Sequence, residues 1–340
     1  MFNDALGDNI LHSYVGANVS AVLGAEQTVL VYEDRPYKKE MTQFFNPWAN
    51  QILSVNAPQV PLFPDIYRQF YILSYPFMMW TTAAQFENPV FLRPVRERPE
   101  NEHAFEVCEQ TLKEVGLEDG AWHCIIHSRE LAYKYKYGHA NLRCADPMNY
   151  FKVAEHIVDR LGGQVVRVGD PSMTRWPKKE GIIDLTRLDG VGVFVCQALA
   201  LSKARFVVAT DGGIHPVGSA FGVPTLLSNL TTGAFCWNPW DLLLTKHFHM
   251  SDGRVLANSD ALLGNVLRYQ DSRDIPANSG IQNIRDNSVE ELIAATEQLH
   301  QNAAELSHLR SLSTSARASG CLSITNHAIG CVGARFFSLS

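Results

Sequence analysis

The sequence predicts an α/β fold of two domains, with a parallel β-sheet in the C-terminal half of the chain. The chain has 340 residues, and a single hydrophobic core stops growing at about 250–300 residues, so two domains are expected. Between residues 122 and 229, short apolar runs alternate with segments of helical periodicity. This alternation is typical of a parallel sheet with helices on both faces. Such sheets bind ligands at the carboxyl ends of their strands.

The composition excludes several classes of protein. Hydrophobic residues make up 46% of the chain and charged residues 19%, which is enough apolar material for packed cores and argues against disorder. The formal net charge of -6 provides no basic field for a nucleic acid. The seven cysteines include no C-x-x-C pair and are odd in number, which indicates reduced thiols rather than a disulfide framework or a zinc site.

The start of the sequence lacks the features of a secretory signal. Its first basic residue is Arg35, whereas a signal peptide begins with positive charge. The most apolar stretch with bulky residues, 71–84, is too short to span a bilayer. We therefore expect a cytoplasmic protein and leave open a peripheral contact with a membrane.

Each element of the predicted sheet has a local signal. Residues 122–127 form a short apolar run that predicts a buried strand. Asp146 and Pro147 provide an N-cap and a first-turn proline for a helix, which Gly162 and Gly163 terminate. Further along the chain we expect strands at 164–168, 182–185, 205–209 and 225–227, and helices at 191–202 and about 214–221.

The N-terminal half carries weaker signals. We expect a helix at 9–24, a strand at 28–32 and an amphipathic helix at 103–115. The stretch 63–86 is rich in aromatic residues. It is a core segment or, as the alternative, a pocket for a lipid-linked or aromatic acceptor.

The predicted division of the chain has three parts. The N-terminal domain covers 1–117 and the C-terminal domain 118–312. The segment 313–340 is assigned separately, with the possibility that it returns to the first domain. Within the second domain, the capping box Ser288-Val289-Glu290-Glu291 opens a long helix that runs to about Leu309.

The strongest local signal is Thr210-Asp211-Gly212-Gly213-Ile214-His215-Pro216, which follows a strand and precedes a short helix. Two glycines allow a tight turn and a close approach to a ligand. The free N–H groups and the positive dipole end of the helix suit a diphosphate. The alternative is an ordinary strand-to-helix turn without a ligand. The candidate donor-binding residues of this turn are Asp211, Gly212, Gly213, Ile214 and His215.

The second signal is His127-Ser128-Arg129-Glu130 at the end of the first strand of the sheet. An arginine there can hold phosphate oxygens with two parallel hydrogen bonds and keeps its charge. The alternative is a surface ion pair between Arg129 and Glu130. Two anion-binding elements at strand ends of one sheet favour the functional interpretation, in which His127 and Arg129 bind the donor.

Further candidate binding residues follow the strand expected at 122–127 and the strand expected at 164–168. Arg143 precedes Asp146, which we expect to cap a helix. Arg143 itself contacts the donor or the acceptor, or lies at the surface. Arg167, Gly169 and Asp170 end the next strand, where the glycine permits a base or ribose to approach closely.

Gly7 and Asp8 lie between a short apolar segment and the predicted N-terminal helix. Asp8 caps this helix or, as the functional alternative, is a general base that faces an interdomain cleft.

The sequence predicts no metal site and no cofactor. His247 and His249 flank Phe248, and two ligands do not make a metal site. The absence of a P-loop sequence argues against a kinase or ATPase of that class. The absence of a D-x-D triplet favours neutralisation of a diphosphate by arginine and a helix dipole over a manganese-dependent mechanism.

These motifs resemble those of known glycosyltransferases. The run from Thr210 to Pro224 resembles the donor-site segment of the bacterial heptosyltransferase family, and Gly7-Asp8 resembles its N-terminal Gly-Asp, whose aspartate is taken as the base. His127-Ser128-Arg129 is similar to the phosphate-binding motif of fucosyltransferases related to nodulation enzymes and protein O-fucosyltransferases. The run from Cys124 to Asp170 is most similar to a poorly characterised group of bacterial glycosyltransferases.

These families share the GT-B architecture, so the resemblance implies two Rossmann-like domains facing across a cleft, the first for the acceptor and the second for the donor. It implies metal-independent, inverting transfer of a hexosyl or related sugar from a nucleotide-diphosphate sugar, of GDP or ADP type. The acceptor would be a hydroxyl of a glycan, a lipid-linked molecule or a small molecule. Asp8 would be the base, and Arg129 would stabilise the developing diphosphate charge. The alternatives are a nucleotide-sugar epimerase or hydrolase on the same fold, and a non-catalytic sugar-binding relative.

Overall fold

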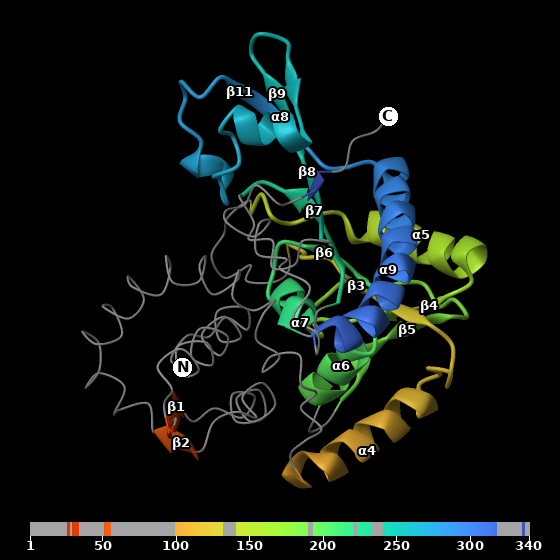
Figure 1. Ribbon diagram of the computed structural model, residues 1–340. Helices are drawn as coiled ribbons and strands as arrows, with labels where there is room; N and C mark the ends of the chain where they lie inside the picture. Colours follow the sequence, from red (N-terminus) through yellow and green to blue (C-terminus); the bar gives the residue numbers. More distant parts are fainter. Residues whose placement is uncertain are drawn as a thin grey trace.

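The described part of the chain is an α/β structure organised around one large parallel sheet. The computed structural model describes residues 26–27, 29–33, 51–55, 99–131, 141–189, 193–220, 223–232, 241–317 and 335–336, and every structural statement below refers to these ranges. The sheet has seven strands in the order β12-β8-β7-β6-β3-β4-β5, and helices pack on both of its faces (Figure 1). The fold class that the sequence predicts is confirmed.

All neighbouring strands of this sheet run parallel. They are β3 (His123–His127), β4 (Gln164–Arg167), β5 (Ile182–Asp184), β6 (Val207–Thr210), β7 (Thr225–Leu230), β8 (Leu242–Thr245) and β12 (Arg335–Phe336). β3 comes first along the chain but lies inside the sheet, with β4 and β5 on one side and β6, β7 and β8 on the other. This is the strand order of doubly wound α/β folds, in which the sheet grows outward in both directions from its first strand.

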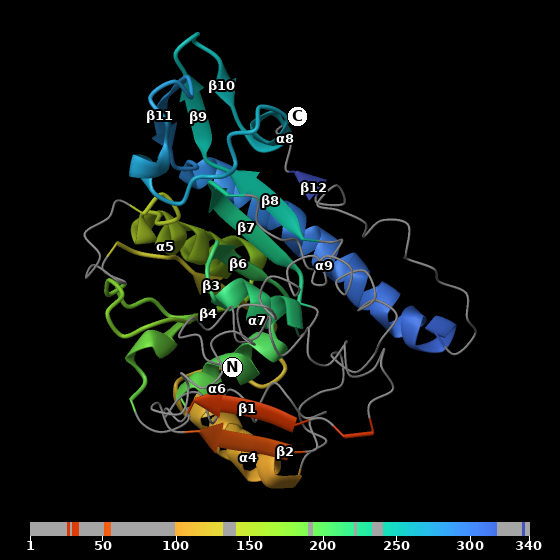
Figure 2. The same cartoon turned by 90° about the vertical axis from the view of Figure 1, so that its left-hand side faces the viewer.

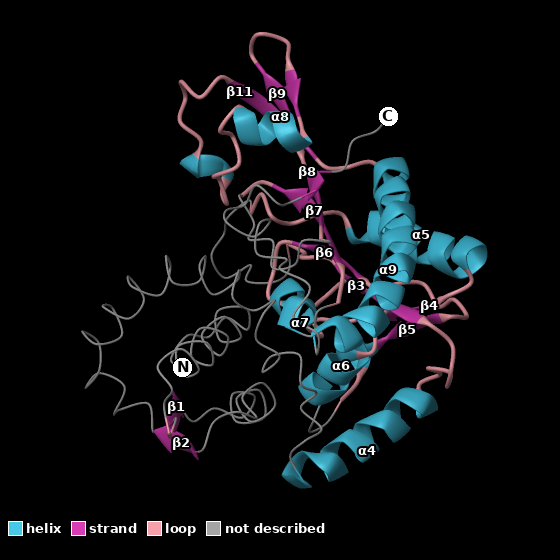
Figure 3. Cartoon of the chain, viewed as in Figure 1, coloured by secondary structure: helices cyan, strands magenta, loops and turns pink. Residues whose placement is uncertain are grey.

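Two groups of helices cover the two faces of the sheet (Figure 3). On one face lie α5 (Pro147–His156), the π-helical turn Ile157–Leu161 that continues it, and α9 (Val289–Arg317). On the other face lie α4 (Pro99–Glu114), α6 (Val193–Ser202) and α7 (Ile214–Ala220). None of the described helices combines the length and the apolarity that a membrane span requires.

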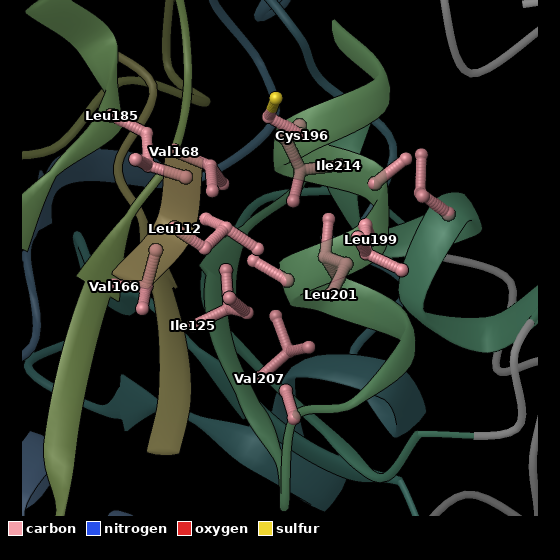
Figure 4. Close-up of a cluster of buried hydrophobic side chains, with 14 of the residues drawn as sticks. Leu112, Ile125, Val166, Val168, Leu185, Cys196, Leu199, Leu201, Val207 and Ile214 are labelled. Atoms are coloured by element: carbon pink, nitrogen blue, oxygen red, sulfur yellow. The ribbon is translucent and has the colours of Figure 1, made fainter. Parts of the chain in front are cut away.

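The alternation of side chains along the strands divides the core between the two faces. Ile125 of β3 and Val207 of β6 point toward α6, where they pack with Leu199 and Leu201 (Figure 4). Ile126, the next residue of β3, belongs to the core on the opposite face. Because both faces are covered, such strands are apolar along their whole length, which is why short apolar runs predict them. Each fully buried side chain of this kind stabilises the fold by about 1.5–3 kcal/mol.

The helix ends have the caps that the sequence predicts. The Asp146 carboxylate accepts a hydrogen bond from the Met148 amide at 2.9 Å as the N-cap of α5. Gly162, with a φ of 71°, ends the π-helical turn in the left-handed conformation. The side chains of Ser288 and Glu291 each accept from the other's amide, at 3.1 and 2.8 Å, as the capping box of α9. This helix then runs to Arg317, beyond its expected end.

Two short strands are described in the N-terminal third of the chain. β1 (Val29–Glu33) and β2 (Gln51–Val55) pair in parallel, and β1 confirms the strand expected there. Gly7-Asp8, the helix predicted at 9–24 and the aromatic stretch 63–86 lie outside the described residues.

The helix α4 packs against the large sheet. It precedes the domain boundary that we predict at residue 117, yet its Phe105, Cys108 and Leu112 are buried in the same core as β3 and α6. Near the C-terminus, the short strand β12 pairs with β8 of the same sheet. The three domain boundaries themselves remain predictions.

An insertion between β8 and α9, residues 247–285, forms a second and smaller sheet, at the top of Figure 2. Its strands are antiparallel in the order β10-β9-β11, and α8 packs with them around a small core. None of the sequence signals described above predicts this unit. Its elements are β9 (His247–Met250), β10 (Val255–Leu256), α8 (Asn258–Leu263) and β11 (Ile281–Arg285), and the buried core residues are Phe248, Ala261 and Val266.

Buried polar contacts fix the base of the insertion to the sheet. Lys246 Nζ lies 2.6 Å from Asp286 Oδ1. Asn229 and Asn287 exchange two hydrogen bonds, in which each amide N–H donates to the other's side-chain oxygen, at 2.8 and 2.7 Å. Asn229 has a φ of 55° at an irregularity in the pairing of β7, a conformation that asparagine tolerates better than most residues. These contacts give the insertion a defined position relative to the carboxyl edge of the sheet.

Candidate functional site at the carboxyl edge of the sheet

The candidate site lies where the chain changes direction within the sheet. β3 and β6 are neighbours, and His127 at the end of β3 pairs with Ala209 of β6. The strands that follow them lie on opposite sides of this pair, β4 next to β3 and β7 next to β6. In doubly wound folds, ligands bind at the carboxyl ends of the strands at this point.

The two predicted anion-binding elements lie side by side there. The Arg129 amide donates a hydrogen bond of 2.8 Å to Thr210 Oγ1. A Cβ atom added to Gly212 would lie 3.4 Å from His127 Cε1, so the imidazole packs directly on the glycine turn. The loop after β3 and the turn after β6 therefore form one continuous surface.

Three basic residues surround Cys144 at the same edge. The Arg129 side chain lies close enough to Cys144 to act on the pKa of its thiol, and Lys246 Nζ donates to the Cys144 carbonyl oxygen at 2.7 Å. Burial raises the pKa of Cys144, and the nearby charges of Arg129, Lys246 and Arg143 oppose that rise. Cations from the loop after β3 and from the end of β8 thus converge on this edge, which favours an anionic ligand.

Arg143 and Asp211 form an ion pair beside the glycine turn. Arg143 Nε lies 3.0 Å from Asp211 Oδ2, and Nη2 donates to Oδ1 at 3.3 Å and to the Asp211 carbonyl oxygen at 3.2 Å. Thr232 Oγ1 donates to the same carboxylate at 2.8 Å. Both carboxylate oxygens are committed to these partners, so Asp211 holds the Arg143 guanidinium next to Gly212.

Burial keeps two histidines of the site neutral at pH 7. Burial, together with the charges of Arg129 and Arg167, lowers the pKa of His127 to about 4. Burial also lowers the pKa of His215 to about 4, although Asp211 acts in the opposite direction. Within the described residues, the buried Nδ1 atom of His127 makes no hydrogen bond. A buried polar atom of this kind is one that a ligand or a water molecule can satisfy.

Because these pKa values are lowered, the stability of the protein is expected to fall as the pH drops from 6.5 toward about 4. In this window the unfolded chain binds a proton at each of the two histidines and the native state does not. Stability therefore rises with pH, by at most about 1.4 kcal/mol per pH unit and per histidine. Urea unfolding at a series of pH values measures the slope, and His127→Asn should reduce it. Equal slopes for variant and wild type would contradict the lowered pKa.

Arg167, which the sequence assigns to donor binding, lies in a buried ion network. Its Nη2 is 2.8 Å from Glu130 Oε1 and its Nη1 is 3.2 Å from Asp184 Oδ2. The guanidinium also stacks on Trp176, 4.3 Å from the ring centroid. The side chain is 0% exposed, so it offers no surface to a ligand. We therefore correct this assignment: Arg167 holds Glu130, the residue that follows Arg129, in place.

Gly169 and Asp170 shape the loop that follows β4. The Gln197 side chain accepts from the Gly169 amide at 3.1 Å and donates to its carbonyl oxygen at 3.0 Å. Gly169 has a φ of 143°, a backbone conformation that residues with a Cβ atom rarely adopt, so this position favours glycine. Asp170 Oδ1 accepts from the Ser172 amide at 2.8 Å. A contact of this loop with a base or ribose remains a prediction.

Two other assignments concern a metal and a base. Among the residues that the structure describes, no three His, Cys, Asp or Glu side chains are grouped as a metal site would need. His247 lies 2.8 Å from Glu291. Asp8 lies outside the described residues, so its role as a base remains a prediction.

Sequence reasoning missed two residues that the fold brings to this edge. Lys246 directly follows β8, and the apolar run Leu242–Thr245 that ends in a lysine is the signal that could have found it. Gln270 reaches Arg143 from the insertion, with Oε1 3.4 Å from Nη1. No local signal marks Gln270, because it is 127 residues from Arg143 along the chain.

The strand order defines a doubly wound α/β protein. The cations near the ends of β3 and β6, the switch point at which the strand order reverses, define a candidate anion site at the carboxyl edge. No protein-family model matches the chain, and a search of curated proteins finds no similar sequence. Among solved structures, the chain is similar to a glycosyl transferase family 9 protein from Veillonella parvula. The identity is 14% and the TM-score 0.51, over 87% of this chain and 94% of the other.

Two heptosyltransferase structures from E. coli are more distant. ADP-heptose lps heptosyltransferase II matches at 10% identity with a TM-score of 0.40, over 66% of this chain and 82% of the other. Heptosyltransferase WaaC with ADP matches at 11% identity with a TM-score of 0.36, over 68% and 88%. The chain thus shares the fold of a glycosyl transferase family 9 protein, as the resemblance implied. The cleft between two facing domains remains a prediction.

Proposed function

We propose that this protein is a metal-independent glycosyltransferase that takes a sugar from a nucleotide-diphosphate sugar. The observation that carries the proposal is that Arg129 and the turn at Gly212 meet at the switch point of a doubly wound sheet, joined by the Arg129–Thr210 hydrogen bond of 2.8 Å. Arginine side chains and exposed backbone N–H groups are the donors that diphosphates favour in proteins. The fold shared with a glycosyl transferase family 9 protein supports the same class.

In this proposal the site neutralises the charge that develops on the leaving diphosphate. Arg129 and Arg143 bind its oxygens, and the amides of the turn at Gly212 add fixed dipoles. His127, neutral at pH 7, offers a ring nitrogen to a phosphate or ribose oxygen. Asp8 deprotonates the acceptor hydroxyl, and transfer proceeds with inversion. Closure of the two domains excludes the water that would hydrolyse the donor.

The remaining features of the proposal follow the resemblance. The donor is of GDP or ADP type, and the acceptor is a glycan, a lipid-linked molecule or a small molecule. The reaction takes place in the cytoplasm.

A thermal-shift screen with ADP, GDP and UDP in the presence of EDTA tests the donor site. We expect one of them to raise the Tm in a concentration-dependent way, because a ligand that binds only the native state adds about 2.7 kcal/mol at 100 times its Kd. The matching nucleosides lack phosphates and should cause no shift. The donor site is wrongly assigned if no nucleoside diphosphate raises the Tm. A Tm shift that appears only when Mg²⁺ or Mn²⁺ is added would contradict the proposal that donor binding needs no metal.

A product assay then separates transfer from the other reactions of a nucleotide sugar. The nucleotide sugar that matches the best nucleoside diphosphate is incubated with and without candidate acceptors. Transfer releases the nucleoside diphosphate only when an acceptor is present. Release without an acceptor indicates a hydrolase, and conversion to another sugar indicates an epimerase.

A further inference from the structure

The insertion reaches the candidate site through residues 268–271. Isolated β-bridges join this segment to Asn141, in the loop after β3, and to Thr232, which follows β7. The Gln270 carbonyl oxygen also accepts a hydrogen bond of 2.8 Å from the Leu142 amide. The segment is therefore tied to two of the loops that border the site, and its backbone position is fixed.

This segment and the turn after β6 hold the Arg143 guanidinium from two sides. Asp211 binds Nε and Nη2 on one side, and Gln270 Oε1 accepts from Nη1 at 3.4 Å on the other. Asp211 is in turn held by Thr232, the residue that bridges to the insertion. The Arg143 side chain keeps 18% of its surface exposed, so part of this side chain is accessible.

The clamp lies beside the turn that the proposed function assigns to the diphosphate. Arg143 Nη2 is 3.2 Å from the carbonyl oxygen of Asp211, the residue directly before Gly212. An anion on the amides of this turn would therefore lie next to the guanidinium. An unrestrained arginine loses rotamer freedom when it binds an anion, whereas a clamped one has already lost it, so clamping raises affinity.

We propose that Gln270 is a positioning residue of the donor site, which acts through Arg143 and makes the insertion part of that site. The ligand is the diphosphate of a nucleotide sugar, so the inference rests on the proposed function. Asp211 is the second positioning residue of the same clamp. Both act on the orientation of Arg143 and need not touch the ligand.

A double-mutant cycle on the full chain tests this inference. The probe is whichever of ADP, GDP and UDP binds wild type most tightly, and Kd is measured by calorimetry. Gln270→Met keeps the size of the side chain and removes the acceptor, and we expect a Kd about three- to tenfold higher. In the Arg143→Ala background, Gln270→Met should cause no further change, because the residue through which it acts is gone. Arg143→Met, which keeps much of the side-chain length and removes the hydrogen-bond donors, replaces the alanine variant if the latter does not fold.

Several controls separate positioning from a structural role. Gln282→Met changes an exposed glutamine on β11 of the same insertion and should leave Kd unchanged. Gln270→Glu keeps an acceptor for Arg143 and should retain more affinity than Gln270→Met. With a matching nucleotide sugar, Gln270→Met should raise the donor KM and also lower kcat, because Arg143 meets the charge that develops on the leaving diphosphate.

Three results would overturn the inference. The first is a Kd of the Gln270→Met variant equal to that of wild type. If the Tm of the ligand-free variant is also lower, Gln270 has a purely structural role; if the Tm is unchanged, Gln270 has no role in the site. Another is an equal loss of affinity in the Arg143→Ala background, since Gln270 would then act independently of Arg143. If no nucleoside diphosphate binds wild type, the proposed function itself fails and the inference falls with it.

Discussion

Arg129→Ala is expected to lose transfer activity by about a hundredfold or more while the protein stays folded. Preorganised cations and N–H donors that meet charge developing in the transition state contribute factors of about 10²–10³ in kcat when one is removed. Arg129 comes directly from the loop that meets the glycine turn. Its guanidinium lies in the group of cations around Cys144, where the proposal places the leaving diphosphate.

A matched arginine distinguishes a local effect from a general loss of charge. Arg175 is exposed, on the loop after β4, and Arg175→Ala should keep near wild-type activity. Arg129→Lys keeps the charge but loses the planar fork, so an intermediate activity is expected. Circular dichroism and the Tm of each variant confirm that it is folded. Near-normal activity of a folded Arg129→Ala protein would show that the donor site has been assigned to the wrong residues.

Five strands of the large sheet, β3 to β7, could be predicted because both faces of the sheet are covered, whereas β8 and β12 were not predicted. A strand such as β3 or β7 is buried along almost its whole length, so its sequence is a short run of mostly apolar residues. The insertion could not be predicted in the same way. β11 is largely exposed and β9 has a single fully buried residue, and neither shows a clear alternation. Its three-residue core leaves too few apolar positions for periodicity to stand out.

The candidate site was predictable to the extent that it depends on strand ends. Parallel strands end at one edge, so Arg129 and Gly212 had to lie near each other once β3 and β6 were neighbours. The direction of a side chain depends on partners that the local sequence does not reveal. Arg167 also lies at the end of a parallel strand, but its side chain pairs with Glu130 and Asp184 and is buried inside the protein. The role of Gly169 likewise depends on Gln197, 28 residues away.

Glu130→Ala is expected to lower the free energy of unfolding by about 3 kcal/mol. Glu130 is 3% exposed and its Oε1 pairs with the fully buried Arg167 at 2.8 Å. Its Oε2 accepts from the Thr174 amide at 2.7 Å. Removal of the carboxylate leaves the buried Arg167 cation with Asp184, at 3.2 Å, as its carboxylate partner among the described residues. It also deprives the Thr174 N–H of its acceptor. Both changes destabilise the native state, and urea unfolding measures their combined effect on the free energy of unfolding.

The reason for this loss can be tested by replacing the whole pair. Glu130→Leu combined with Arg167→Met removes the uncompensated charge, so the double variant should be more stable than Glu130→Ala. Asp119→Ala breaks an exposed pair with Lys113, 2.7 Å long, and should change stability too little to resolve. If Glu130→Ala is as stable as wild type, the buried pair does not hold the loop after β3. If it is destabilised as expected, nucleoside diphosphate binding should weaken as well, because Glu130 fixes the backbone that carries Arg129.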